Sequence, residues 1–380
     1  MNIIDLYEKY DNLYYIGGVV RDILIKMPSQ DVDITVEGNA IEFCKNIDEC
    51  EMVQSNPDFG TVRVKINNQI YDISSTRKEI YPKKGHLPRV VEIGCPLKDD
   101  VIRRDFTINA LAKNTKTGEI IDYVGGREDI SNKILRVLHD NSFIDDPTRI
   151  IRGLKFAVRF GFSLDEHTKS LQNAYLSNIN YDMCYKRLKD ELISTFNLNS
   201  NRAFETFVND KMYKLITKKD FELPDYDIQG LVRKYYKNLS NVWLIYIALI
   251  DTEKLELNKT ETKIVDDYKK LVELDIKNDY EIVRAFEKCE VESILLYEIT
   301  KKDGKAIKYL DELNEIKPEI DGNDLKKMGL PPSEKYAKIF DYILQEKLKN
   351  PELTKPEELE LAEQYEKKLS KNNNDSKGDS

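Results

Sequence analysis

Residues 17–22 read Gly-Gly-Val-Val-Arg-Asp, and residues 31–36 read Asp-Val-Asp-Ile-Thr-Val. Successive side chains of a strand point to opposite faces, so Asp31, Asp33 and Thr35 should share one face and the apolar residues the other. Two neighbouring carboxylates raise each other's pKa unless a cation neutralises them, and oxygen ligands suit a hard ion such as Mg²⁺. We therefore expect Asp31 and Asp33 to bind magnesium and to be catalytic.

The glycine pair lies between an expected strand over residues 13–16 and an expected helix that starts at Val19. Glycine lets backbone N–H groups approach phosphate oxygens, the helix N-terminus attracts anions, and Arg21 adds a guanidinium. Either motif alone is more often ordinary structure, but together they indicate a site for a nucleoside triphosphate. We expect Gly17, Gly18 and Arg21 to hold the triphosphate.

A hairpin is expected farther along the chain. Residues 61–66 and 69–74 alternate in polarity and flank Asn67-Asn68, a pair typical of tight turns. Asp72 would then lie on a strand near the two carboxylates. It is either a third catalytic carboxylate, which helps to deprotonate an attacking hydroxyl, or an ordinary surface residue.

Two further strings complete a pattern. RRDFTINALA occupies residues 103–112 and DDPTRIIRGLKFAVRFGF occupies residues 145–162. Together with the motifs above, in this order, they resemble the bacterial-type (class II) tRNA nucleotidyltransferases and related poly(A) polymerases. The resemblance is strong over roughly the first half of the chain. It implies a magnesium-dependent enzyme that uses ATP and CTP and acts on the 3′ end of tRNA without a nucleic acid template.

The resemblance also implies roles for single residues. Arg104 would contact the nucleotide, and Asp105 and Asn109 would lie near its sugar. The same run also fits the start of a helix, with Asp105 as its N-cap, and both interpretations can hold together.

A helix with one apolar and one cationic face is predicted over residues 149–159. An Asp–Arg couple offers both acceptors and donors to the Watson–Crick edge of a base, and the resemblance assigns this task to Asp146 and Arg149. Arg152 would lie near the nucleotide as well. Asp145 or Asp146 followed by Pro147 is also a good helix N-cap and first-turn signal, which needs no ligand.

The chain departs from the family pattern at several positions. Asp145 stands where Glu is commonest, and Lys155 replaces an arginine fork with a point charge. The segment over residues 77–88 is similar to members that add only the terminal adenosine at least as much as to full CCA builders. The range of nucleotides added therefore stays open.

The predicted fold class is α+β, with a small mixed sheet and helices in an N-terminal head and an all-helical remainder. Gly125-Gly126 is a candidate hinge, although a plain loop fits equally well. The expected regions are a catalytic head (1–125), a nucleotide-selecting neck (126–195), a helical body (196–300), a tRNA-binding helical tail (301–366) and a disordered end (367–380).

Composition fits a cytoplasmic enzyme. The 380 residues are 41% hydrophobic, and no apolar N-terminal segment indicates export or membrane insertion. The five cysteines show no metal-ligand spacing and predict no disulfide framework. The formal net charge is −9, so RNA binding requires a locally positive surface. Candidate patches lie at residues 83–84, 103–104, 186–189, 218–219 and 233–234.

The sequence thus predicts template-independent transfer of CMP and AMP to the 3′ end of tRNA. An enzyme that adds only A or only CC, a poly(A) polymerase, and an RNA-binding module with a degenerate head are the alternatives. Metal-dependent glycosyl transfer also uses Asp-x-Asp, but it leaves residues 103–112 and 145–149 unexplained. No protein partner can be deduced.

Overall fold

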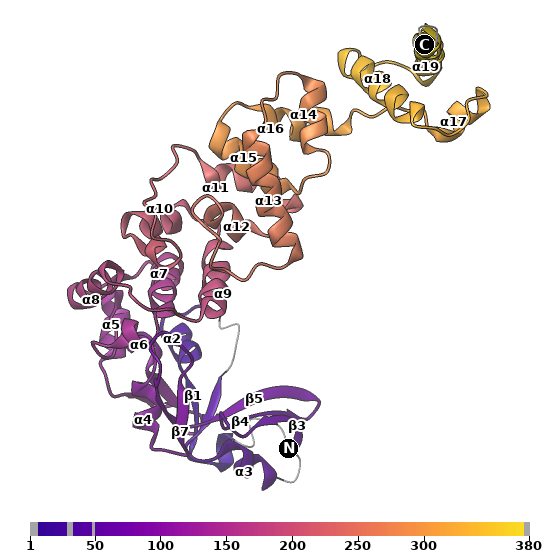
Figure 1. Cartoon of the computed structure of the whole chain (residues 1–380). Coiled ribbons are helices and arrows are strands. Elements are labelled where there is room, and N and C mark those ends of the chain that lie inside the picture. Colours follow the sequence, from indigo (N-terminus) through magenta and orange to yellow (C-terminus); the bar gives the residue numbers. More distant parts are fainter. Residues whose placement is uncertain (1–6, 29–32, 48–49, 376–380) are drawn as a thin grey trace. The chain divides into compact units, whose positions relative to one another are not determined.

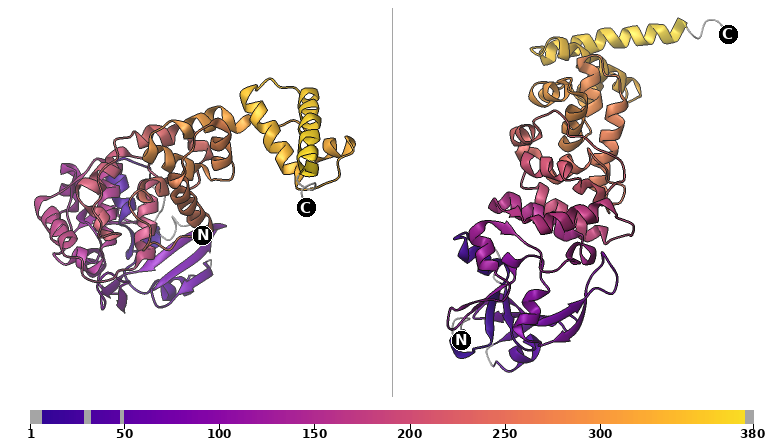
Figure 2. Two further views of the ribbon diagram at one scale, coloured as in Figure 1. Left: turned by 45° about the horizontal axis from the view of Figure 1, so that its top comes forward. Right: turned by 90° about the vertical axis from the view of Figure 1, so that its left-hand side faces the viewer.

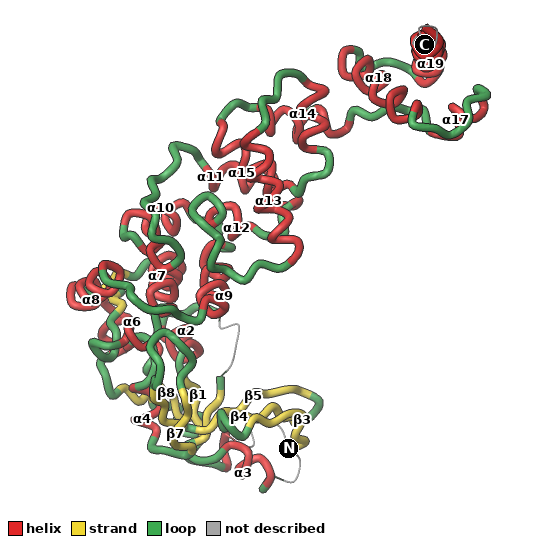
Figure 3. Tube along the Cα trace, viewed as in Figure 1, coloured by secondary structure: helices red, strands yellow, loops and turns green. Residues whose placement is uncertain are grey.

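The computed structural model describes residues 7–28, 33–47 and 50–375 (Figure 1). The chain divides into two compact units. The first unit contains Met1–Leu223 and Ile250–Glu256, and the second unit contains Pro224–Leu249 and Leu257–Ser380. Every strand in the described residues belongs to the first unit, whereas the second unit is built from helices (Figure 3). This confirms the predicted α+β class.

A mixed seven-stranded sheet forms the centre of the head, in the order β3-β4-β5-β2-β1-β8-β9. Strands β2 and β5 run parallel, and the other neighbours run antiparallel. The strands are β1 (Leu13–Ile16), β2 (Ile34–Val36), β3 (Glu51–Asn56), β4 (Thr61–Ile66), β5 (Gln69–Ser75), β8 (Leu111–Asn114) and β9 (Ile120–Asp122).

The predicted hairpin is confirmed as β4 and β5. Asn67 and Asn68 both have positive φ, at 48° and 62°, which is the conformation that a two-residue turn with the right twist requires. Strand β4 buries Val62 and Val64 on one face. That face packs with helix α3 (Ala40–Lys45), so one side of the sheet carries a continuous apolar core.

Two small sheets and short helices complete the first unit. Strands β6 (Arg77–Ile80) and β7 (Arg89–Ile93) pair with each other, as do β10 (Ile134–Leu135) and β11 (Ser163–Leu164). The helices are α2 (Gly18–Leu24), α4 (Leu97–Ile102), η1 (Thr107–Asn109), α5 (Gly126–Asn132), α6 (Ser142–Asp145), α7 (Thr148–Phe160), α8 (Glu166–Ser177), α9 (Tyr185–Phe196), α10 (Asn201–Asn209) and η2 (Met212–Leu215).

The candidate hinge, Gly125-Gly126, forms a turn that the side chain of Asp122 holds in place. The carboxylate of Asp122 accepts hydrogen bonds from four successive backbone N–H groups, from Val124 to Arg127. A Cβ on Gly126 would lie 2.2 Å from the carbonyl oxygen of Thr107, so glycine is required here for close packing of α5 against η1. Movement at this turn stays a prediction.

The second unit buries its single tryptophan, Trp243. Its helices are α11 (Ile228–Tyr235), η3 (Tyr236–Asn238), α12 (Val242–Ile247), α13 (Lys259–Glu273), α14 (Asp279–Phe286), α15 (Val291–Lys301), α16 (Lys305–Asp311), η4 (Leu313–Glu315), α17 (Gly322–Lys327), α18 (Lys335–Lys349) and α19 (Lys355–Asp375) (Figure 2). None of the helices in the described part of the chain is long and apolar enough to cross a membrane.

Helix α19 differs from the expected boundary of the C-terminal region. We expected disorder over residues 367–380, but the helix continues to Asp375. Lys367 and Glu363 form an ion pair at 2.6 Å with i,i+4 spacing, which stabilises an exposed helix even where no apolar face is present. Residues 376–380 lie outside the described part. The other expected domain boundaries stay predictions.

Candidate active site

Strand pairing brings Asp33 to the glycine turn. The backbone N–H of Ile16, the last residue of β1, donates to the carbonyl of Asp33 at 3.2 Å, and the side chain of Asp33 is exposed. The face shared with Thr35 does not form a row of open side chains, because Thr35 is fully buried and its hydroxyl donates to the carbonyl of Ser74. Asp31 lies outside the described residues, so only Asp33 of the predicted carboxylate pair can be described.

Asp72 lies on the strand next to β2, as predicted. The register places Ile34 opposite Ile73, so Asp33 and Asp72 each precede this pair. Both carboxylate oxygens of Asp72 accept from Arg63, at 2.8 Å each, on the exposed surface of β4 and β5. These hydrogen bonds from Arg63 lower the pKa of Asp72. Asp72 is thus a charged carboxylate with a fixed partner.

A metal site cannot be assembled from the described residues alone. They contain no group of three or more His, Cys, Asp or Glu side chains that could hold a metal ion. Asp33 fits as one ligand, because it offers exposed carboxylate oxygens beside the glycine turn and oxygen donors suit a hard divalent ion. The second predicted ligand, Asp31, is not among the described residues.

Arg104 lies directly against Gly17. Gly17 has a φ of +72°, and a Cβ there would lie 2.8 Å from Nη1 of Arg104. The guanidinium is held by Asp100 of α4, whose Oδ2 lies 3.1 Å from Nη2. Nε of Arg104 is buried and has no hydrogen-bond partner among the described residues. A guanidinium held in place with Nη1 beside a glycine turn is suited to bind an anionic oxygen of a nucleotide.

Arg21 is enclosed next to Gly18. Its side chain is 5% exposed, and burial lowers its pKa from the ordinary value even though Asp22 opposes this effect. Nη1 donates to Oδ1 of Asn109 at 2.6 Å, and the guanidinium lies 4.5 Å from the ring centre of Phe160. Arg21 therefore joins α2 to η1 and α7 through Nη1 and the stacked guanidinium, while Nε and Nη2 donate to Asp22 within α2.

Asp105 is the centre of a buried polar network. Its carboxylate accepts from Asn109 and from the backbone N–H of Phe106, and it pairs with Arg152 of α7 at 2.6 Å. Burial alone would raise the pKa of Asp105, but Arg152 and Asn109 outweigh it and hold the pKa well below its usual range. Glu191 of α9 binds the other side of Arg152 at 3.0 Å.

The run around Asp105 is not the start of an α-helix. It forms the single turn η1 and then strand β8, because Leu111 and the residues after it pair with β9 and β1. Asp105 accepts from the backbone N–H of Phe106 at 2.8 Å, but the residue at the N-cap of η1 is Phe106, so the expectation of Asp105 as an N-cap was wrong. The structure thus brings together Arg21, Asn109, Asp105 and Arg152, which the sequence predicted as separate contacts to a nucleotide.

Asp146 and Arg149 are both buried at the start of α7. Asp146 accepts from the backbone N–H and the hydroxyl of Thr148, a local capping contact at the start of α7, although the residue directly before the helix is Pro147. Its other oxygen pairs with Arg187 of α9 at 2.6 Å. Arg149 donates to the hydroxyls of Ser142 and Tyr81, at 2.6 and 3.1 Å. Each member of the predicted couple is therefore oriented by other elements.

Several supporting residues were not identified from sequence. Asp100 pairs with both Arg103 and Arg104, and its spacing of three and four residues before them on a helix was an available signal. Tyr81 carried no such signal, because its bond to Arg149 joins positions 68 residues apart.

The site-bearing region matches a known domain. Residues 13–136 match the poly A polymerase head domain. The chain is 33% identical over 359 residues to an A-adding tRNA nucleotidyltransferase of Aquifex aeolicus, covering 84% of this chain and 43% of that protein. It is 28% identical over 377 residues to a CCA-adding enzyme of Lactobacillus helveticus, covering 89% of this chain and 90% of that protein.

A solved structure of a CCA-adding enzyme in an apo form has a TM-score of 0.80 and 25% identity, with 94% of both chains covered. The match extends over both units, so it supports the arrangement of elements found within each. The chain spans 43%, 44% and 38% of the length of the three A-adding relatives that it matches. Relatives of both kinds therefore share this head and the helices that follow it.

Proposed function

Because this chain belongs to the bacterial tRNA nucleotidyltransferase family, we propose that it transfers CMP and AMP from CTP and ATP to the 3′ end of tRNA. One observation carries the proposal: the guanidinium of Arg104 lies against the Gly17 turn, with the exposed carboxylate of Asp33 at the adjoining strand end. A group suited to bind an anion and a group suited to bind a metal ion thus both lie beside the glycine turn, which supports the proposal. A tRNA substrate implies action in the cytoplasm.

The proposed reaction is an in-line displacement. The 3′ hydroxyl oxygen of the RNA bonds to the α-phosphorus, the bond from that phosphorus to the bridging oxygen breaks, and pyrophosphate leaves with the electron pair. Enzymes of this family generally use a divalent metal. We propose Mg²⁺, held by Asp31 and Asp33, which would neutralise charge on the phosphates. Gly17, Gly18 and Arg104 would position the triphosphate, with Arg21 supporting the turn from beneath.

Asp72 is the candidate acceptor for the proton of the 3′ hydroxyl. Arg63 holds the pKa of Asp72 low, so a role of Asp72 as proton acceptor predicts different results for variants of the two residues. If Asp72 accepts the proton, Asp72→Asn lowers kcat while Arg63→Gln keeps it and shifts the acid limb of the pH–rate profile upward. Equal kcat for both variants would remove Asp72 from the mechanism.

Base selection is proposed for α7. Asp146 and Arg149 would present an acceptor and donors to the Watson–Crick edge of the incoming base, and Arg152 would lie next to them. Asp105 and Asn109 would act near the sugar and hold Arg152 in place. Support comes from the fixed orientation of Asp146 by Arg187 and of Arg149 by Tyr81.

Addition of the terminal A alone is the second candidate function. The first relatives by similarity are A-adding enzymes, at 33%, 29% and 39% identity, whereas the matches to CCA-adding enzymes cover more of those proteins' length. Purified protein given tRNA that lacks one, two or three terminal residues, with CTP and ATP separately, distinguishes the two. Unlimited A addition to an RNA primer would instead indicate a poly(A) polymerase.

The metal assignment has its own test. Asp31→Ala and Asp33→Ala should each abolish nucleotide incorporation, because each would remove a proposed metal ligand. Asp33→Ala should also keep the thermal unfolding temperature, because Asp33 is exposed. Asp58→Ala is the matched control, since Asp58 is also an exposed aspartate of the head. Removal of divalent ions by a chelator should stop the reaction, and magnesium should restore it. Undiminished incorporation by either ligand variant would refute the assignment.

A further inference from the structure

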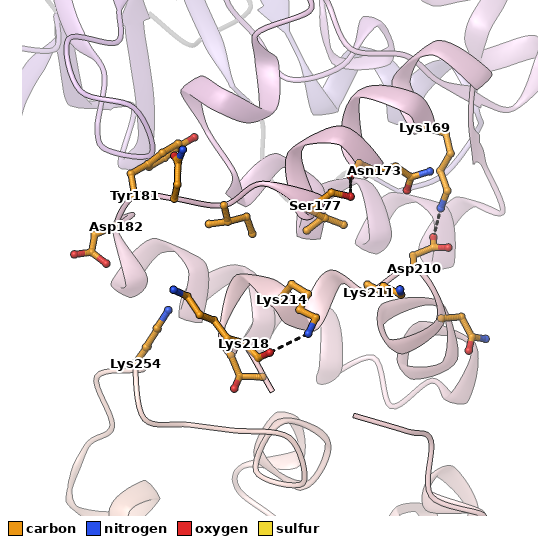
Figure 4. A pocket seen from close by; sticks show the side chains of 15 residues that line it. Lys169, Asn173, Ser177, Tyr181, Asp182, Asp210, Lys211, Lys214, Lys218 and Lys254 are labelled. Atoms are coloured by element: carbon orange, nitrogen blue, oxygen red, sulfur yellow. Dashed lines mark hydrogen bonds and ion pairs between the residues drawn. The ribbon is translucent and has the colours of Figure 1, made fainter. Parts of the chain in front are cut away.

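A second polar depression lies in the first unit, built from α8, α10, the segment around η2 and the return segment Ile250–Glu256. It encloses about 970 Å³. Figure 4 shows lysine side chains on both of its walls, with Lys169 on α8 and Lys214, Lys218 and Lys254 across from it. We call it the lysine groove, and its cationic side chains are Lys169, Lys211, Lys214, Lys218 and Lys254.

Two of the five lysines are already neutralised. Lys169 pairs with Asp210, and Lys214 pairs with Asp220 at 2.9 Å. Lys211, Lys218 and Lys254 are exposed and form no ion pair within the described ranges. One carboxylate of the lining, Asp182, stands at the end of the groove near Lys254 (Figure 4). An excess of positive charge is thus concentrated in a chain whose net charge is −9.

Apart from the apolar side chains of Leu176 and Ile179, the remaining uncharged lining is polar. Asn173, Asn180 and Asn209 contribute amides and Ser177 contributes a hydroxyl, whereas the hydroxyl of Thr217 is buried and donates to Asp251. Mobile ammonium groups bind phosphates as point charges, without base specificity, and amides and hydroxyls suit ribose 2′-hydroxyls. A depression of about 970 Å³ is much larger than one phosphate. Its chemistry therefore fits a stretch of sugar–phosphate backbone.

One hydrogen bond links the lining of the lysine groove to the segment before α7. Tyr181 lines the groove, and its hydroxyl donates to the carbonyl of Ile144 at 3.0 Å. Ile144 directly precedes Asp145-Asp146, where the base-selecting helix begins. Tyr181 thus connects the groove lining to the residues that precede the proposed base-selecting helix.

We propose that the lysine groove binds the sugar–phosphate backbone of the RNA substrate, outside the site where nucleotides are added. The proposal rests on the proposed function, and it assigns Lys211, Lys218 and Lys254 as phosphate contacts. It predicts that these lysines contribute to RNA affinity and to its salt dependence, and not to nucleotide binding or the chemical step.

The test uses the full-length chain and two triple variants of equal charge change. Lys211→Gln, Lys218→Gln and Lys254→Gln are combined in the groove variant. The control combines Lys9→Gln, Lys45→Gln and Lys98→Gln, which alter exposed lysines of the same unit outside the groove. Affinity for tRNA is measured over a series of salt concentrations, together with KM and kcat for tRNA and for ATP.

In the groove variant, the slope of log Kd against log salt should fall by about 3, because three phosphates are no longer neutralised by a lysine. KM for tRNA should rise by roughly tenfold at moderate salt, while kcat and KM for ATP stay at the wild-type values. The control should keep the wild-type slope. A slope unchanged in the groove variant, or lowered equally in the control, would overturn the proposal.

Two further outcomes separate the proposals from each other. A wild-type protein that neither binds tRNA nor adds nucleotides defeats the proposed function itself. Active wild-type protein with a groove variant of unchanged slope defeats the groove alone. Protection of the three lysines from acetylation by tripolyphosphate, but not by tRNA, would assign the groove to a small polyanion and would also overturn RNA binding.

Discussion

The sharpest structural prediction concerns the carboxylate of Asp105. This side chain is 7% exposed and pairs with Arg152 through two nitrogens, at 2.8 and 2.6 Å. Asp105→Asn keeps the shape of the side chain and an oxygen that accepts from the N–H of Phe106. The substitution therefore removes one negative charge and keeps the contacts at Oδ1, but it places an amide NH2 group, which cannot accept a hydrogen bond, against the two donating nitrogens of Arg152.

The expected cost follows from the burial of the pair. Removing one partner of a buried ion pair costs about 3–5 kcal/mol, because the other charge is left without compensation. Arg152 retains Glu191 and its side chain is 33% exposed, which reduces this cost. We expect a loss of about 2–3 kcal/mol in the free energy of unfolding of the first unit. That corresponds to a fall of about 5–10 °C in its unfolding temperature.

Asp72→Asn provides a matched control for stability. It removes the carboxylate of another doubly hydrogen-bonded Asp–Arg pair, but the side chains of Asp72 and Arg63 are 62% and 48% exposed. Exposed pairs contribute only about 0–1 kcal/mol. Urea unfolding followed by circular dichroism compares both variants with the wild type. Equal losses for the two variants, or a loss under about 1 kcal/mol for Asp105→Asn, would refute the reasoning from burial.

The same variant has a defined pH dependence. The pKa of Asp105 is depressed in the folded protein, so its stabilisation is complete above the pKa of an unfolded aspartate, about 3.9. The stabilisation is lost as the pH falls toward the folded pKa. The stability difference between wild type and Asp105→Asn should therefore be constant from about pH 7 to 5 and shrink below about pH 4. A difference that grows on acidification would contradict a charged Asp105.

The remaining predictions concern the glycine turn, the carboxylate of Glu191 and the hydroxyl of Tyr81. Gly17→Ala should lower stability by about 1–3 kcal/mol and raise KM for ATP, because alanine at this position strains the backbone and its methyl group displaces Arg104. Gly18→Ala should fold normally, because the new methyl group meets only the end of the Arg21 side chain, at 3.4 Å. Glu191→Gln should weaken discrimination between ATP and CTP, since it frees Arg152 and Lys155; unchanged kcat/KM ratios would exclude this role. Tyr81→Phe should raise KM for the nucleotide by a few-fold, because Arg149 loses one acceptor worth about 1 kcal/mol, and an unaltered KM would show that Ser142 suffices.

Local features of the fold could be predicted from the sequence. The hairpin at Asn67-Asn68 was predictable because its signals lie within the turn itself and in the alternation of the flanking strands. The capping role of Asp146 was predictable for the same reason, since its acceptor and donor are two residues apart. Polarity and spacing determine such features before any tertiary contact forms.

Partners from distant segments were less accessible. Sequence suggested that Asp146 and Arg149 act as a couple, but the structure gives Asp146 to Arg187 and Arg149 to Tyr81, at separations of 41 and 68 residues. Thr35 shows the same difficulty: alternation placed it with Asp33 on an open face, and pairing with β5 buried it. Which residues meet across elements depends on packing that no local pattern records.

These distant partners have a consequence for how a base would be read. The bonds from Thr148 and Arg187 use both oxygens of Asp146, yet each carboxylate oxygen can accept more than one hydrogen bond. Arg149 uses Nη1 and Nη2 for its fixed contacts, and its Nε carries a further donor. The remaining acceptor and donor sites are therefore held at set positions before a nucleotide arrives. Little conformational entropy is then lost when a base binds, and a base with the wrong edge would leave buried groups unpaired. If Asp146 and Arg149 select the base, the selection depends on the residues of α9 and of the β6–β7 segment that hold these two side chains as much as on the two side chains themselves.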